Sequence, residues 1–120
     1  MSQTAWERRP PDHTVTQNDV SVLIEDVLRD SKGVIVDLTG VTEVRYQARL
    51  PGQAISAGID QAATVVAPAT GGTVRRTLVA GDTDTSGDLI EQWKVTFSGG
   101  QIERFPARKH KLRIVPDSVV

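Results

Sequence analysis

Two stretches of strict alternation constrain the fold of this 120-residue chain more than any other feature. From residue 43 to residue 50, apolar residues occupy every second position and polar or charged residues lie between them. Residues 92–97 repeat the design, with Trp93, Val95 and Phe97 on one side. A period of two is that of a β-strand with one buried and one wet face. Such strands belong to antiparallel sheets, so the chain is predicted to be all-β.

Shorter runs rich in β-branched residues predict the remaining strands. Residues 20–28 also fit a helical stripe, but a strand is favoured because the turn at residues 30–33 leads directly into the next apolar run. Glycine pairs mark two turns, at residues 68–72 and 98–101, since glycine accepts the positive φ that tight hairpins require. Short strands at regular intervals indicate a sandwich or a barrel. The other expected strands are residues 34–36, 64–67, 73–79, 102–105 and 112–115.

The length suits one domain with a single core. Residues 1–18 are rich in Pro, Gln, Thr and charge, and are predicted to form an extended N-terminal arm, leaving residues 19–120 as the domain. Trp6 is the one large apolar side chain of that arm, and two roles stay open for it: an anchor on a partner, or packing against its own domain.

Composition excludes several classes of protein. Without cysteine, the chain forms no disulfide, thiol nucleophile or thiolate metal site, which favours a reducing compartment. The N-terminal residues lack the apolar run of a signal peptide, and no segment is apolar for long enough to form a membrane helix. A net charge of −1 argues against nucleic acid as the main partner.

Four pieces between Asp19 and Pro116 together resemble the immunoglobulin-like domain at the N-terminus of phage baseplate upper proteins, and related small phage neck and tail proteins. They are the turn at residues 30–33 with residues 36–40 after it, the turn at residues 67–72, the acidic loop at residues 82–87 before the Trp93 strand, and residues 98–101 leading to Phe105 and Pro106. The chain departs from that family at Leu89, where related domains place an aromatic residue. The resemblance implies an immunoglobulin-like antiparallel β-sandwich of about seven strands.

The same resemblance implies a structural component of a tailed bacteriophage virion, in its neck, tail or baseplate. Such a protein would act through contacts with other phage structural proteins as a homo-oligomer or ring-associated subunit, assembled in the bacterial cytoplasm and located in the virion. The alternative is a carbohydrate-binding or adhesive module, in which Trp6, Tyr46 or residues 82–88 would touch a glycan.

Basic residues supply most of the candidates for a protein interface. A cationic cluster at residues 104–113 could bind an acidic partner surface. Two other interpretations stay open: the cluster binds nucleic acid, or it is a solvated edge strand whose charges prevent pairing with another strand. The full set of interface candidates is Trp6, Arg8, Arg9, Arg104, Arg108, Lys109, Lys111 and Arg113.

No catalytic, cofactor or metal site is predicted. Residues 82–88 resemble the first half of a calcium-binding loop, with oxygen-bearing side chains at alternate positions. Trp93 occupies the twelfth position, where such a loop needs a bidentate glutamate, so a turn rich in Asp and Ser is favoured. The histidines are His13, in the expected arm, and His110, in the basic cluster, and neither has an evident relay partner in sequence. The chain is therefore expected not to be an enzyme.

Overall fold

The computed structural model describes residues 10–54, 58–79, 81–84 and 86–116, with the backbone alone at residues 106–109. Eight strands and one short 3-10 helix, η2 (Ala69–Gly71), make up the described part of the chain. The strands are β1 (His13–Thr16), β2 (Leu23–Val27), β3 (Glu43–Arg49), β4 (Ile59–Ala62), β5 (Thr64–Val65), β6 (Thr73–Thr77), β7 (Gly87–Thr96) and β8 (Ile102–Val115).

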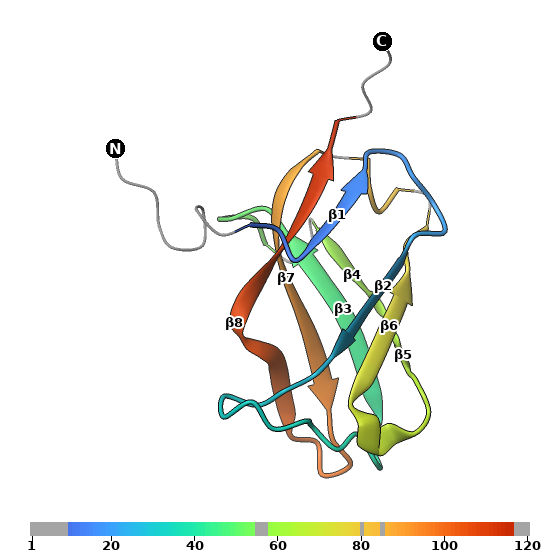
Figure 1. Ribbon diagram of the computed structural model, residues 1–120, viewed down its shortest axis with the longest axis vertical. Helices are drawn as coiled ribbons and strands as arrows, with labels where there is room; N and C mark the ends of the chain where they lie inside the picture. Colours follow the sequence, from blue (N-terminus) through green and yellow to red (C-terminus); the bar gives the residue numbers. More distant parts are fainter. Residues whose placement is uncertain (1–9, 55–57, 80, 85, 117–120) are drawn as a thin grey trace.

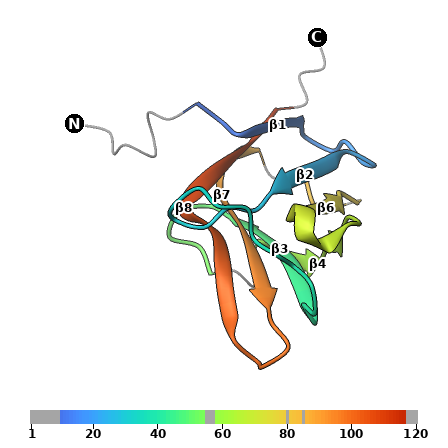
Figure 2. The same cartoon turned by 60° about the horizontal axis from the view of Figure 1, so that its bottom comes forward.

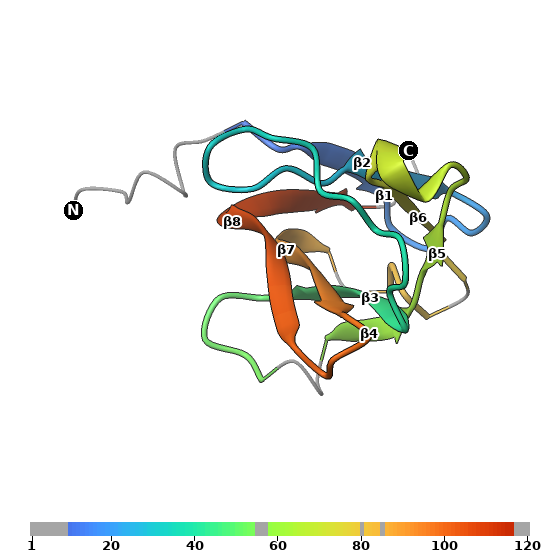
Figure 3. The ribbon, with the colours of Figure 1, turned by 90° about the horizontal axis from the view of Figure 1, so that it is seen from below.

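Two sheets face each other in a β-sandwich, which confirms the predicted fold class. The large sheet has the order β1-β8-β7-β3-β4 and the small sheet the order β2-β6-β5. Seen from below, the small sheet lies along one side and β8, β7, β3 and β4 along the other (Figure 3). Neighbouring strands are antiparallel except for β1, which runs parallel to β8. Strand β1 lies beside β2 (Figure 1), so it closes one side of the sandwich.

The β7–β8 pair is interrupted by a wide bulge. Trp93 is opposite Phe105 and Glu91 is opposite His110, so the single residue Gln92 of β7 faces residues 106–109 of β8. A bulge bends the strand that carries the extra residues, and β8 bends away from β7 at this level (Figure 2). The sequence predicts two strands here, at 102–105 and 112–115, whereas the structure has one bent strand.

The core confirms the inward positions of the alternating strands. Trp93 and Tyr46 are fully buried, with ring centroids 4.8 Å apart and planes tilted by 60°. Aromatic pairs favour such tilted geometry. Around them pack aliphatic side chains of both sheets and of the segments between strands, among them Ile24, Leu38, Leu78, Val74, Val95, Leu112 and Ile114.

The turns at the glycine pairs form as predicted. Gly100 has φ +83°, and the backbone N–H of Phe97 donates to the carbonyl of Gln101, closing the β7–β8 hairpin. Gly72 has φ +68° and follows η2, where its N–H donates to the carbonyl of Ala69. No helix among the described residues is long and apolar enough to cross a membrane.

Three expectations about single segments differ from the structure. Residues 34–36 form no strand, and only Ile35 makes an isolated bridge, to Arg29. Strand β4 was not predicted, because residues 59–62 alternate poorly. The expected arm at residues 1–18 includes His13–Thr16, which is strand β1 of the large sheet; residues 1–9 lie outside the described part of the chain. Short strands with mixed side chains leave too little pattern to recognise.

Candidate functional site

A row of buried and half-buried polar side chains crosses the interior between the two sheets. The ring of His13 lies between two carboxylates: its Nδ1 is 2.7 Å from Oε1 of Glu91, and its Nε2 is 3.3 Å from Oδ1 of Asp26. Each carboxylate has a further donor, because the Tyr46 hydroxyl donates to Glu91 and the Trp93 indole N–H donates to Asp26 over 2.7 Å. The five groups come from strands β1, β2, β3 and β7. They therefore tie the small sheet to the large one.

Strand alternation places both carboxylates inside. Glu91 follows Leu89 and precedes Trp93 on the inward face of β7, and its side chain is 1% exposed. Asp26 lies on β2 between the buried Ile24 and Leu28, the residue that follows the strand, and its side chain is 19% exposed. Burying a carboxylate is costly unless it is hydrogen-bonded and paired. His13 and the aromatic donors meet that requirement.

The two carboxylates determine the protonation state of His13. Burial lowers the pKa of this imidazole, but hydrogen bonds to Asp26 and Glu91, and the negative charges of both groups, outweigh burial and raise the pKa to about 10. The ring is accordingly an imidazolium at neutral pH, with one N–H for each carboxylate. The described cluster then has a net charge of −1, from two carboxylates and one cation.

A cavity of about 130 Å³ opens on the Asp26 side of this cluster. Its lining includes Asp26, Trp93 and His110, together with residues 27–29 of the chain after β2. His110 reaches this place because it is the cross-strand partner of Glu91, at the end of the bulge. His110 Nε2 is also 3.9 Å from Asp12. The imidazole of His110 thus lines the same cavity as the Asp26 carboxylate.

A metal ion fits better between His13 Nε2 and Asp26 than between His13 Nδ1 and Glu91. His13, Asp26 and Glu91 each offer a ligand atom, and these atoms lie within 4.8 Å of one another. Two ligands of a tetrahedral zinc ion, bound at about 2.0–2.1 Å, stand about 3.3 Å apart, which matches the 3.3 Å between Nε2 and Oδ1 of Asp26. The 2.7 Å contact of Nδ1 with Glu91 is a direct hydrogen bond. A carboxylate on the outer nitrogen of a ligating histidine is the usual arrangement around protein metals.

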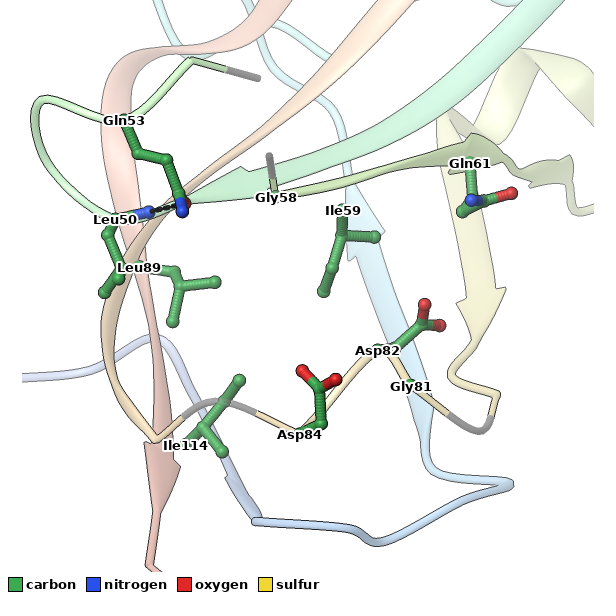
Figure 4. A pocket seen from close by; sticks show the side chains of 10 residues that line it. All are labelled: Leu50, Gln53, Gly58, Ile59, Gln61, Gly81, Asp82, Asp84, Leu89 and Ile114. Carbon is green, nitrogen blue, oxygen red and sulfur yellow. Dashed lines mark hydrogen bonds between the residues drawn. The ribbon is translucent and has the colours of Figure 1, made fainter. Parts of the chain in front are cut away.

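The acidic loop at residues 82–88 lies at another cavity, at the end of the sandwich. Figure 4 shows Asp82 and Asp84 at its rim and the aliphatic side chains of Leu50, Ile59, Leu89 and Ile114 around its interior. Asp82 is engaged, since its Oδ2 accepts from the backbone N–H of Val79 and lies 3.2 Å from Arg76. Calcium needs six to eight oxygen ligands. The described lining combines aliphatic side chains with Gln53, Gln61, Asp82 and Asp84, and the absence of calcium from this loop stays a prediction.

The predicted interface candidates do not form one patch. Arg104 is exposed on the outer face of the large sheet, whereas Lys111 is fully buried with its Nζ 3.8 Å from Asp88, so it offers no surface contact. Arg113 is paired with the same Asp88 at 2.8 Å. The edge-strand interpretation does not hold for residues 112–114, which pair with both β1 and β7, whereas residues 102–105 of β8 pair with β7 alone among the described strands. Trp6, Arg8 and Arg9, and the side chains of Arg108 and Lys109, lie outside what the structure describes.

The polar cluster itself escaped prediction. His13, Asp26 and Glu91 are far apart in sequence and carry no motif. One signal was available: Glu91 interrupts the apolar row that runs from Leu89 to Val95, and a lone carboxylate at an inward position requires a partner. Tyr46 is fully buried against that carboxylate, so it cannot be the glycan contact considered under the alternative of a carbohydrate-binding module.

Comparison with known proteins gives one structural likeness. No family model and no curated protein sequence matches the chain. A solved structure, CopC from Methylosinus trichosporium OB3b, matches with a TM-score of 0.49 and 15% identity, over 92% of this chain and 90% of that one. This finding corrects the expected role in a tailed bacteriophage virion, because the structure that the chain resembles is CopC and not a phage neck, tail or baseplate protein. The likeness is to a fold, and nothing about ligands follows from it.

Proposed function

We propose that this protein is a binding module, not an enzyme, for one divalent transition-metal ion, held between the two sheets. His13 Nε2 and the Asp26 carboxylate are the first two ligands, and His110 supplies a third from the wall of the same cavity. The observation that carries the proposal is the pair formed by His13 and Asp26: two donor atoms at ligand spacing, 3.3 Å apart, beside a cavity lined by a second histidine.

Charge supports an ion at this place. With His13 protonated, the cluster of His13, Asp26 and Glu91 has one negative charge in excess. A divalent cation that replaces the proton on Nε2 leaves a neutral ring, and two carboxylates then balance two positive charges. The displaced proton leaves to solvent, as it does when metals bind to protonated ligands.

The donor atoms indicate which ions suit the site. Two imidazoles and one carboxylate are ligands for Zn²⁺, Cu²⁺, Ni²⁺ or Co²⁺, while Ca²⁺ and Mg²⁺ prefer oxygen donors throughout. Glu91 retains the proton on Nδ1 and so fixes the orientation of the ring. The side chains of His13 and Asp26 are 18% and 19% exposed, which leaves an approach from solvent.

The proposal is tested by titrating the full chain with Co²⁺ and Zn²⁺. Co²⁺ bound to nitrogen and oxygen ligands absorbs visible light, and Zn²⁺ affinity follows from competition and from calorimetry. We expect a stoichiometry of one ion per chain and a loss of affinity of at least tenfold in His110→Ala and in Asp26→Asn. A matched control is Asp60→Asn, which removes a carboxylate that pairs with Arg45 on the outer side of the large sheet.

His13→Ala is a poor test by itself, because it also leaves two carboxylates without their cation. The deciding comparison is therefore His110→Ala with Asp60→Asn, both checked for an unchanged fold by circular dichroism. Equal affinity in these two variants, or no visible Co²⁺ spectrum in the native chain, would overturn the proposed site.

A further inference from the structure

A hollow of about 330 Å³ lies on the outer face of the large sheet, on the side away from the polar cluster. Its lining is Gln47 and Arg49 of β3, Ile90 and Gln92 of β7, and Arg104 of β8. These residues alternate with the buried positions of their strands, so they share the outward face. The hollow coincides with the bulge, because Gln92 is the residue that faces the extra length of β8.

Positive charge accumulates along this face and is only partly compensated. Lys94 is directly opposite Arg104 on one side and Arg45 on the other, so three cations form one row across three strands. Like charges in such pairs are about 5 Å apart at their Cβ atoms and destabilise a sheet. Arg45 is compensated by Asp60 and Glu43. Among the described residues, Lys94, Arg104 and Arg49 have no ion pair, and the Arg49 guanidinium donates only to the backbone carbonyl of Gln53.

We infer that this hollow binds a tetrahedral oxyanion, a phosphate or sulfate group, between Arg49 and Arg104. Guanidinium groups present parallel N–H donors that match the oxygens of phosphate. A dianion in the hollow offsets the charges of Arg49 and Arg104, which have no ion pair among the described residues, better than a single carboxylate does. Ile90 adds an apolar contact, which suits an organic ester of the anion rather than the free ion. This inference is independent of the metal proposal, since the two sites share no residue.

The test uses nitrogen-labelled protein and the side-chain Nε–Hε resonances of arginine, which report on each guanidinium separately. Inorganic phosphate, phenyl phosphate and acetate are titrated at constant ionic strength against sodium chloride. We expect saturable shifts for Arg49 and Arg104 with both phosphates, and a loss of affinity of at least tenfold in Arg49→Gln and Arg104→Gln. Arg75→Gln is the control, because Arg75 is exposed on the small sheet opposite Glu25.

Two outcomes support the site and distinguish its ligands. If phenyl phosphate binds more tightly than inorganic phosphate, the ligand is an ester that contacts Ile90; if the two bind equally, the ligand is the free anion. Shifts that grow without saturation and match those in chloride would overturn the inference. Binding that Arg75→Gln weakens as much as Arg104→Gln does would overturn it as well.

Discussion

Removing one hydroxyl from the interior tests whether the polar cluster stabilises the sandwich. In Tyr46→Phe the ring keeps its place against Trp93, 4.8 Å away between centroids, so packing changes little. The substitution removes the hydrogen bond from the hydroxyl to Glu91, a carboxylate that is only 1% exposed to solvent. His13 remains as the second partner of Glu91.

A hydrogen bond to a charged group is worth about 1.5–3 kcal/mol, and a buried carboxylate that loses a donor is expected near the middle of that range, about 2 kcal/mol. With a urea dependence of about 2 kcal/mol per molar, the unfolding midpoint should fall by about 1 M. The measurement is urea denaturation followed by tryptophan fluorescence, to which the buried Trp93 contributes together with Trp6, at neutral pH and without added metal.

A double-mutant cycle makes the result specific. Glu91→Gln alone, Tyr46→Phe alone and the two together give the coupling energy between the side chains, which we expect to exceed about 1 kcal/mol. A loss below about 0.5 kcal/mol in Tyr46→Phe, with no coupling to Glu91, would refute the conclusion that this hydrogen bond stabilises the core.

Two further predictions concern other parts of the sandwich. The hydrogen bonds and charge of Arg113, together with the charge of the buried Lys111, lower the pKa of Asp88. The stability that Asp88 contributes is therefore present above the carboxyl's unfolded pKa of about 3.9 and is lost as pH falls through its folded value. Native protein should be more stable than Asp88→Asn at about pH 6, because the substitution also removes a partner of the buried Lys111 ammonium, and thermal melts that show the same gap below about pH 2 would contradict this. Gly72→Ala should destabilise by about 2 kcal/mol or more, because the position has φ +68° and a Cβ would lie 2.8 Å from the Val36 carbonyl oxygen; Gly100→Ala, at φ +83° in open space, should cost only about 1 kcal/mol, and equal losses in urea melts would show that the close approach at Gly72 is unimportant.

Strand positions with a strong local pattern were predictable from the sequence, for physical reasons that act locally. Alternation around Tyr46 and Trp93 identifies the faces of β3 and β7, because a period of two leaves each face either buried or wet. Gly100 marks a hairpin because its conformation excludes most other residues. Strand β4 could not be identified, since it is short and its place depends on pairing with β3.

The sequence by itself therefore determined an all-β fold, a sandwich or a barrel, and the inward positions of its clearest strands. Only the tertiary structure decided what His13, Asp26 and Glu91 do, because three strands from distant parts of the chain must pack before their side chains meet. It also decided that Glu91 would be opposite His110, since the bulge shifts the register of the β7–β8 pair between Trp93 and Glu91. Local patterns specify which face of a strand is buried; the contacts that create binding sites depend on which strands become neighbours.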